Sequence, residues 1–297
     1  MSMKTLIAFC AVAGLILPAS AGAETRHHHH HHKARPRAEA HPHLSSYAVA
    51  IYDEKTGAEL YAKNTDAVMP IASITKLMTA MVTLDAGLPL DEKLAIGEED
   101  VDNLRHSSSR LPVGTRLTRG EMLRLALMSS ENRAAAALGH SYPGGIDAFV
   151  AKMNEKAKAL GMEHSHFVDS SGLNSENVST AADLVKMVEA AYKYRVIRED
   201  TTTSTHEVVL PRSERVLHYN NSNALVKYKA SNDWHIGLSK TGYINEAGHC
   251  LVMHSTIAEK PVVIVLLDSW GSMTRIGDAN RIRRWLESQA ATGRSFI

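Results

Sequence analysis

The first clear hydrophobic pattern lies between residues 47 and 62. Two mostly apolar segments, 47–52 and 58–62, flank the polar, glycine-containing segment 53–57. Apolar segments joined by a short turn with glycine are typical of a β-hairpin. The folded part of the chain is therefore predicted to begin with two antiparallel strands.

Apolar positions then recur at helical spacing between Ser73 and Asp85. They are Leu77, Met78, Met81, Val82 and Leu84. This spacing places them on one face of a helix, so the sequence predicts a buried helix with Ser73 in its first turn. Further helices are expected over residues 119–128, 132–140, 146–160 and 180–194.

Strand patterns return near the end of the chain. Residues 234–243, 248–257 and 261–267 predict an antiparallel meander, and residues 276–289 predict a closing helix. Because strands lie at both ends of the sequence and helices lie between them, the terminal strands should join in one sheet. The expected fold is α/β in the broad sense, of the α+β type: a five-stranded antiparallel sheet flanked by helices, with an inserted helical lobe and a cleft between them.

Composition narrows the functional classes. Of the 297 residues, 44% are apolar, which suits one large domain or two closely packed ones. Lys plus Arg total 33 against 32 for Asp plus Glu, and only 5% of residues are aromatic. Neither a basic groove nor a base-stacking surface is indicated, so nucleic acid is not an expected partner.

Residues 1–23 have the pattern of a signal peptide. Lys4 precedes a mostly apolar stretch over residues 6–17, which is followed by Pro18 and by small residues up to Ala23. The apolar core is shorter than the roughly 20 residues that span a membrane. We expect cleavage after Ala23, export from the cytoplasm and no transmembrane anchor.

Residues 24–43 are expected to form an unstructured leader. They contain an uninterrupted hexahistidine from His27 to His32, which is either an engineered tag or a native metal-chelating tract. The folded domain is then predicted over residues 44–290, followed by a short tail over residues 291–297.

The chain has two cysteines. Cys10 falls in the signal peptide and follows Phe9, where a lipoprotein signal would carry a small residue, so lipidation is not expected. Cys250 alone remains in the mature chain, and no intramolecular disulfide can form. Its apolar neighbours predict a buried strand residue rather than a reactive thiol.

Ser73 and Lys76 form the first candidate catalytic pair. They belong to Ser73-Ile74-Thr75-Lys76, the only Ser-x-x-Lys in the chain. At a helix start this spacing puts hydroxyl and amine one turn apart on the same face, where the amine can take the hydroxyl proton and the Ser73 N–H can serve as an oxyanion donor. Such a tetrapeptide occurs by chance about once in a chain of this length, so the alternative is a solvated helix pair.

Two further motifs strengthen this assignment. Penicillin-binding proteins and class A β-lactamases combine such a pair with a Ser-Asp-Asn-like triplet and a Lys-Thr-Gly triplet. Both follow here in the right order: Ser130-Glu131-Asn132 lies at a break between two predicted helices, and Lys240-Thr241-Gly242 lies on a predicted strand.

Each triplet has a second match in the chain. Lys55-Thr56-Gly57 precedes the nucleophile in a predicted hairpin turn, and Ser175-Glu176-Asn177 lies in a polar loop rather than between apolar helices. We interpret both as structural because neither has the context that the chemistry requires.

With these motifs the sequence resembles the D-alanyl-D-alanine carboxypeptidase/endopeptidase family of low-molecular-mass penicillin-binding proteins. The resemblance covers nearly all of the mature chain and is carried by residues 70–80, 129–135, 167–173 and 239–243. Residues 126–133, 142–145 and 247–253 look most like the penicillin-binding protein 7 type of D,D-endopeptidase. The resemblance implies the β-lactamase/transpeptidase-like fold.

The resemblance also implies roles for the catalytic residues. Ser73 would be acylated, Lys76 would be its general base, and Ser130 would pass a proton to the departing amine. A neutral Lys76 is required for this, and lowering its pKa from about 10.4 to about 7.4 costs about 4 kcal/mol. Partial burial and the positive charge of Lys240 are the expected causes.

The remaining motif residues would bind substrate by the same resemblance. Asn132 would hold the peptide carbonyl, and Lys240 and Thr241 would bind the backbone or carboxylate of the scissile D-residue. Gly242 would let the substrate lie along the strand, and the N–H of Tyr243 would complete the oxyanion hole.

The implied protein is a periplasmic serine D,D-endopeptidase that hydrolyses D-alanyl-diaminopimelate cross-links of peptidoglycan. Peptidoglycan stem peptides would be its substrates, β-lactams its inhibitors, and no cofactor or metal would be needed. Only 55 residues follow Gly242, enough to finish the sheet and one helix, whereas many carboxypeptidases of the family add a C-terminal β-domain and a membrane anchor. This favours the endopeptidase, with the D-alanyl-D-alanine carboxypeptidase as the alternative.

Other classes fit less well. A serine β-lactamase would need a deacylating Glu in a loop whose counterpart here, residues 167–173, has the peptidase form. A penicillin-binding sensor would need a transmembrane tether. Neither a Gly-x-Ser-x-Gly elbow nor a His-Glu-x-x-His helix occurs, and His164 and His166 lack further metal ligands nearby in sequence.

Overall fold

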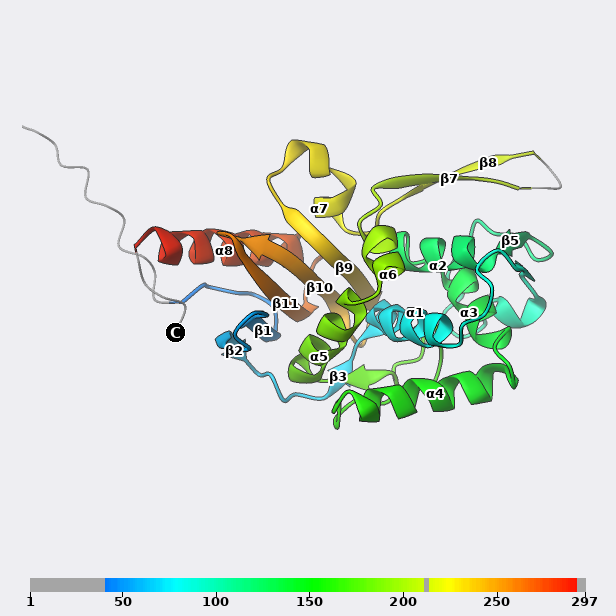
Figure 1. Ribbon diagram of the computed structural model, residues 1–297, viewed down its shortest axis with the longest axis horizontal. Helices are drawn as coiled ribbons and strands as arrows, with labels where there is room; N and C mark the ends of the chain where they lie inside the picture. The colour runs from blue at the N-terminus through cyan, green and yellow to red at the C-terminus, as the bar shows by residue number, and fades with distance from the viewer. Residues whose placement is uncertain (1–40, 211–213, 293–297) are drawn as a thin grey trace, which may run out of the picture. The chain divides into compact units, whose positions relative to one another are not determined.

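A five-stranded antiparallel sheet in the order β2-β1-β11-β10-β9 organises the computed structural model, which describes residues 41–210 and 214–292 (Figure 1). Its strands are β1 (Ala48–Asp53), β2 (Glu59–Lys63), β9 (His235–Ile244), β10 (Gly248–Ile257) and β11 (Lys260–Ser269). Ala50 of the first strand lies opposite Val265 of the last. The predicted union of the terminal strands in one sheet is therefore confirmed.

Helices cover both faces of this sheet. Helix α5 (Ala181–Tyr192) packs on β11 and belongs to the larger apolar core, and α8 (Ser272–Ala291) packs on β10 in a second core. Successive residues of β10 alternate between the two, with Val252 in the first and Leu251 in the second. A strand that is buried on both faces reads as a continuous apolar run, which is the pattern that the sequence has here.

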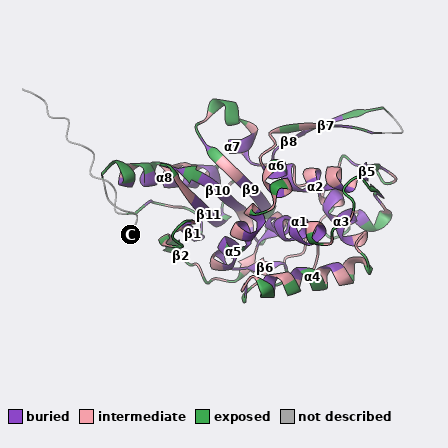
Figure 2. Cartoon of the chain, in the orientation of Figure 1, coloured by how far each residue is buried: buried purple, intermediate pink, exposed green. Residues whose placement is uncertain are grey.

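The helical lobe surrounds α1 (Thr75–Asp85). This helix contacts α2 (Arg119–Met128), α3 (Asn132–His140), α4 (Gly145–Ala159), α5 and α6 (Arg195–Thr201). Every residue from Thr75 to Thr83 is buried, so α1 is buried on all sides rather than on one face (Figure 2). A helix in this position can hold a polar side chain out of water, as Lys76 shows below.

Several small elements were not predicted. They are β3 (Met69–Pro70) paired with β6 (Val178–Ser179), β4 (Lys93–Ala95) paired with β5 (Arg116–Thr118), the hairpin of β7 (Thr205–Val209) and β8 (Val216–Asn220), α6, α7 (Ala224–Lys227), η2 (Glu98–Asp100) and η3 (Lys229–Ser231). Most have two to five residues, too few for a hydrophobic period to emerge.

Two local predictions need correction. Ser73 does not lie in the first turn of the α-helix but in the 3-10 turn η1 (Ala72–Ile74) that leads into it, because Ala72 has a positive φ of 48°. The end of the expected leader is ordered: Pro42 is buried, and the ring of His41 lies 6.2 Å from that of Tyr61.

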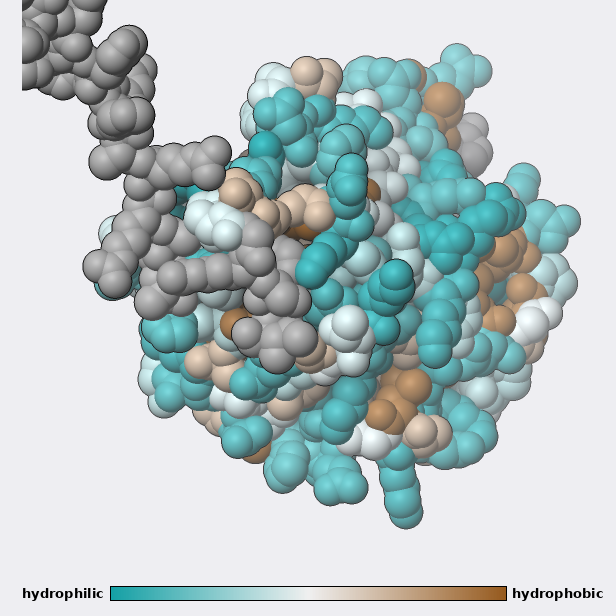
Figure 3. Space-filling view, turned by 60° about the vertical axis from the view of Figure 1, so that its left-hand side comes forward, coloured by the Kyte–Doolittle hydropathy of each residue, from teal (hydrophilic) through white to brown (hydrophobic). Residues whose placement is uncertain are grey.

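The signal peptide, the hexahistidine and most of the leader lie outside the described residues, as do residues 293–297 of the tail. Within residues 41–210 and 214–292, no helix combines the length and the hydropathy that crossing a bilayer requires. On the face shown in Figure 3, apolar side chains appear only in small separate patches among hydrophilic ones.

Candidate active site

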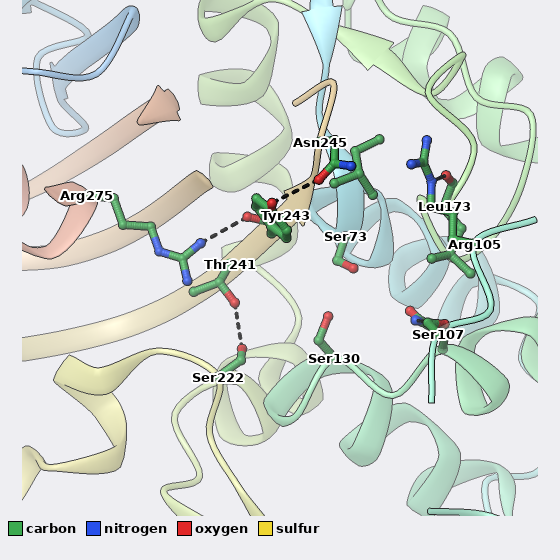
Figure 4. Close-up of a pocket in the computed structure, with 13 residues that line it drawn as sticks. Ser73, Arg105, Ser107, Ser130, Leu173, Ser222, Thr241, Tyr243, Asn245 and Arg275 are labelled. Carbon is green, nitrogen blue, oxygen red and sulfur yellow. Dashed lines mark hydrogen bonds between the residues drawn. The ribbon is translucent and has the colours of Figure 1, made fainter. Parts of the chain in front are cut away.

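A cleft of about 450 Å³ opens where the edge strand β9 meets η1 and the loops of the helical lobe (Figure 4). Its lining residues are Ser73, Arg105, Ser107, Ser130, Asn132, Leu173, Ser222, Thr241, Gly242, Tyr243, Ile244, Asn245 and Arg275. All three predicted motifs contribute to it, so segments that are far apart in the sequence form one site.

Ser73 and Lys76 meet as the spacing predicts. The Nζ of Lys76 lies 2.8 Å from Ser73 Oγ, 2.8 Å from Asn132 Oδ1 and 2.6 Å from the carbonyl oxygen of Ser171. Lys76 has no solvent-exposed surface. The amine is therefore held by three oxygens, one of which belongs to the candidate nucleophile.

Burial lowers the pKa of Lys76 to about 7, against the opposing effect of the carboxylates of Asp169 and Glu131. The expected shift is present, but its cause differs from the expectation. Burial is complete rather than partial, and the repulsion attributed to Lys240 is instead felt by Lys240 itself. At neutral pH a large fraction of Lys76 can therefore be the unprotonated base.

Ser130 lines the cleft, and the buried Lys240 lies behind it. Lys240 Nζ donates to Ser130 Oγ at 3.0 Å and to the carbonyl oxygen of Thr241 at 2.8 Å. Burial, followed by the positive charges of Lys76 and Arg275, holds the pKa of Lys240 well below its usual range. Ser130 has a positive φ of 61°, unusual for a residue with a side chain and frequent at functional sites.

Asn132 joins the amine of Lys76 to the cleft wall. It is the first residue of α3, its Oδ1 accepts from Lys76, and its Nδ2 donates to Ser107 Oγ at 2.9 Å. Asn132 thus fixes Lys76 and lines the cleft at once, which is compatible with the predicted contact to a substrate carbonyl.

Gly242 lies where β9 comes closest to η1. A Cβ at this position would lie 2.8 Å from the carbonyl oxygen of Ile71 and 3.3 Å from the backbone nitrogen of Ser73. Only glycine lets the strand approach Ser73 this closely. The next residue, Tyr243, lines the cleft, and its ring stacks on His249 with centroids 4.3 Å apart.

Sequence reasoning missed Arg275, Ser222, Arg105 and Ser107. Arg275, near the start of α8, donates to the carbonyl oxygens of Gly242 and Cys250 at 2.9 Å each, and Ser222 Oγ lies 2.7 Å from Thr241 Oγ1. These residues come from a helix and two loops that share no motif spacing with Ser73. A single sequence carries no signal that would have found them.

The loop that contains the second Ser-Glu-Asn match supports the site from behind. The Asp169 carboxylate accepts from the backbone N–H groups of Ser171, Gly172 and Asn174 and from Asn177 Nδ2. Asn177 is fully buried. The structural interpretation of this match is confirmed, since Asn177 and Asp169 hold the loop whose Ser171 carbonyl binds Lys76.

The second Lys-Thr-Gly match also has a structural role. Lys55 and Thr56 donate their backbone N–H groups to Asp53 Oδ1 in the turn between β1 and β2. His164 and His166 are both exposed, and the described part of the chain contains no group of three or more metal-ligating side chains that could hold an ion.

The fold and the paired Ser73–Lys76 and Ser130–Lys240 contacts define an active-site serine hydrolase. The model of peptidase family S11, described as D-alanyl-D-alanine carboxypeptidase, matches residues 35–271. The chain belongs to this family of serine peptidases.

Relatives in sequence and solved structures are consistent with this family assignment. A D-alanyl-D-alanine endopeptidase of Pseudomonas aeruginosa is 49% identical over 249 residues, which are 84% of this chain and 79% of that protein. The Streptomyces K15 DD-transpeptidase shares the fold with a TM-score of 0.75 and 30% identity, over 82% of this chain and 97% of that one. Penicillin-binding protein D2 of Listeria monocytogenes, in its cefotaxime-bound form, has a TM-score of 0.72 and 28% identity. The match covers 83% of this chain and 99% of that one. The β-lactamase/transpeptidase-like fold is thereby confirmed.

Proposed function

We propose that this protein is a D,D-endopeptidase that hydrolyses D-alanyl-diaminopimelate cross-links of peptidoglycan through an acyl-enzyme on Ser73. The observation that carries the proposal is the 2.8 Å contact between Ser73 Oγ and a fully buried Lys76 whose pKa is about 7. An amine in this state can remove a proton from the nucleophile at neutral pH.

Acylation would proceed through three proton transfers. Ser73 Oγ attacks the carbonyl carbon of the D-alanyl residue while its proton moves to Lys76 Nζ, and the backbone N–H groups of Ser73 and Tyr243 receive the oxyanion. The C–N bond then breaks, and the departing amine takes a proton from Ser130. The proton held by Lys76 passes on to Ser130 Oγ, so that Lys76 is again neutral before deacylation. Lys240, 3.0 Å from Ser130 Oγ, is positioned to support this relay.

Deacylation would reuse the same base. A water molecule attacks the ester carbonyl, its proton passes to Lys76, and the ester bond to Ser73 Oγ breaks with return of a proton to the serine. No carboxylate or imidazole is among the residues that line the cleft. Asp169 is occupied by backbone donors, so a β-lactamase type of deacylating carboxylate is not supported.

The charge of the cleft suits an anionic substrate. On the side of Thr241, Arg275 lines it, Lys240 lies just behind it, and no acidic side chain is among the lining residues. The amine that leaves a cross-link carries a carboxylate on the same carbon, and cationic donors bind such a group well. The 49% identity to a protein named D-alanyl-D-alanine endopeptidase favours a cross-link over a terminal D-alanine.

β-Lactams would act as inhibitors by acylating Ser73. Penicillin-binding protein D2 of similar fold is known in a cefotaxime-bound form. We also propose that residues 44–290 form the catalytic domain and that residues 1–23 direct it to the periplasm, where peptidoglycan lies.

The test uses two substrates and one inactive control. Purified protein and its Ser73→Ala variant are incubated with cross-linked dimeric muropeptides and with monomeric pentapeptide. We expect wild type to convert dimer to monomer without releasing D-alanine from pentapeptide, and Ser73→Ala to do neither. Release of D-alanine without dimer cleavage would instead establish the carboxypeptidase, and sustained rapid nitrocefin turnover would establish a β-lactamase.

A further inference from the structure

Arg105 lies on the side of Ser73 that the proposed chemistry leaves unused. Figure 4 shows Arg105 with Leu173 on one side of Ser73, and Thr241 with Ser222 on the other. Arg105 lines the cleft and comes from the loop between η2 and β5. It therefore brings a positive charge to a part of the site with no assigned role.

The loop that carries Arg105 is built around one carboxylate. Asp102 accepts from the backbone N–H groups of Leu104, Arg105 and Ser107 at 3.0, 2.9 and 2.8 Å. Against the opposing effect of burial, a bond from the Ser107 hydroxyl and these backbone bonds lower the pKa of Asp102. The same loop places Ser107 against Asn132. The backbone of Arg105 is thus fixed relative to the catalytic residues.

The guanidinium of Arg105 already binds one carboxylate at the cleft. Its Nε donates to the carbonyl oxygen of Leu173, and its Nη2 lies 2.9 Å from Oε2 of Glu246 in the turn between β9 and β10. The side chain of Arg105 is 22% exposed and that of Glu246 is 48% exposed. A pair this open to water is weak, so an incoming carboxylate can replace Glu246 at small cost.

The direction of the substrate follows from the proposed function, on which this inference rests. Ser130 protonates the departing amine, and Lys240 and Thr241 bind the leaving residue. The acyl-donor peptide must then extend the other way from Ser73, toward Arg105 and Glu246.

We propose that Arg105 binds a side-chain carboxylate of the acyl-donor stem peptide, in exchange for Glu246. The group of this class in a diaminopimelate-containing stem is the carboxylate at the far end of the diaminopimelate side chain. An L-lysine in its place keeps the chain and the amine but lacks the carboxylate. Arg105 is therefore a specificity-determining residue for acidic donor stems.

The experiment compares two synthetic cross-linked dimers that differ only in the donor residue, meso-diaminopimelate or L-lysine. For wild type we expect kcat/KM to favour the diaminopimelate dimer by about tenfold or more, the size of one charge-assisted hydrogen bond. In Arg105→Gln this preference should fall toward one, mainly through KM. Glu246→Gln should keep or increase the preference, because it removes only the competing carboxylate.

Two outcomes would overturn the inference. One is a loss of kcat/KM in Arg105→Gln that is equal for both dimers. The other is a loss of preference in Glu246→Gln as large as that in Arg105→Gln, which would show that the ion pair only holds the loop in place. Acylation by a fluorescent penicillin verifies that each variant is folded. If wild type is acylated but cleaves neither dimer, the proposed function fails instead.

Discussion

The Nζ of Lys76 and the Oγ of Ser73 lie 2.8 Å apart, and the amine has no exposed surface. Desolvation brings the pKa of Lys76 to about 7, whereas an exposed lysine would remain protonated at that pH. The short distance allows the proton of Ser73 to pass to Lys76, and burial keeps part of the Lys76 population unprotonated so that it can accept this proton. The pH profile of acylation follows from both.

The acylation rate should rise with pH and level off above about pH 7. The protonated amine cannot accept the Ser73 proton, so below the pKa of Lys76 the rate should fall about tenfold per pH unit. Stopped-flow measurement of the second-order rate constant with a fluorescent penicillin checks this. A profile that keeps rising to pH 10 would mean that Lys76 retains an ordinary pKa and would contradict its role as base.

Ser130→Ala should slow acylation by about 10² to 10⁴-fold, because it removes the hydroxyl between Lys240 and the departing amine. Ser129→Ala is the matched control, since the Ser129 hydroxyl donates to the carbonyl oxygen of Leu125 within its own helix end. Rates with penicillin and with a dimeric muropeptide measure both variants. Equal losses of acylation rate in Ser130→Ala and Ser129→Ala would show that the effect is structural.

Gly242→Ala should lower the acylation rate at least about 100-fold, since the added Cβ would lie 2.8 Å from the carbonyl oxygen of Ile71 and displace β9 from Ser73. The second Lys-Thr-Gly match provides the control. Gly57 has a φ of +69° with nothing within 4 Å of the added Cβ. Gly57→Ala should cost about 1 to 2 kcal/mol of stability and leave acylation unchanged.

The failure of this contrast would be informative. If Gly57→Ala lost activity at a temperature where it remains folded, the interpretation of residues 55–57 as a mere turn would be wrong. Melting temperatures by calorimetry separate this case from simple unfolding.

The three motifs and the main sheet could be predicted because each rests on local signals. The spacing of Ser73 and Lys76 is set by the helix, and the strands of the sheet are apolar runs long enough to recognise. The second Lys-Thr-Gly match and the second Ser-Glu-Asn match could also be assigned from their immediate neighbours in sequence, which indicate a turn and a polar loop. Proximity within the cleft followed only because the family resemblance supplied it.

The parts that could not be predicted depend on long-range packing. Complete burial of Lys76 results from helices on all sides of α1, and hydropathy had marked only one face of it. Arg105 and Arg275 both line the cleft although they lie 170 residues apart in the sequence. Neither segment has a pattern that predicts its contact with the other. The positive φ of Ala72, at the start of the 3-10 turn that contains Ser73, is a backbone conformation that the hydrophobic pattern does not mark.

The second Ser-Glu-Asn match predicts a loss of stability rather than of chemistry. Asn177→Ala would leave the backbone N–H of Val168 without its acceptor and would remove one of the four donors that hold the Asp169 carboxylate, at a cost of about 3 kcal/mol. Asn132→Ala should instead slow acylation at least about tenfold, because Lys76 loses one of its three acceptors. Denaturant unfolding and penicillin acylation of both variants separate the two effects. Similar profiles for the two asparagines would contradict the assignment.

Cys250 should not react with thiol reagents in the folded protein. It has no exposed surface, its Sγ donates to the carbonyl oxygen of Ala247 at 3.3 Å, and burial raises the pKa of the thiol to about 11. The thiolate that such reagents require is therefore both scarce and inaccessible at pH 8.

Mass spectrometry of mature, signal-free protein should show no adduct in buffer and one adduct per chain in guanidinium chloride. Acylation of Ser73 by penicillin should be unaffected by prior treatment with the reagent in buffer. An adduct formed in buffer at the rate of a free thiol would contradict this prediction and would show that β10 opens at Cys250, the residue that pairs with Gly242 of β9.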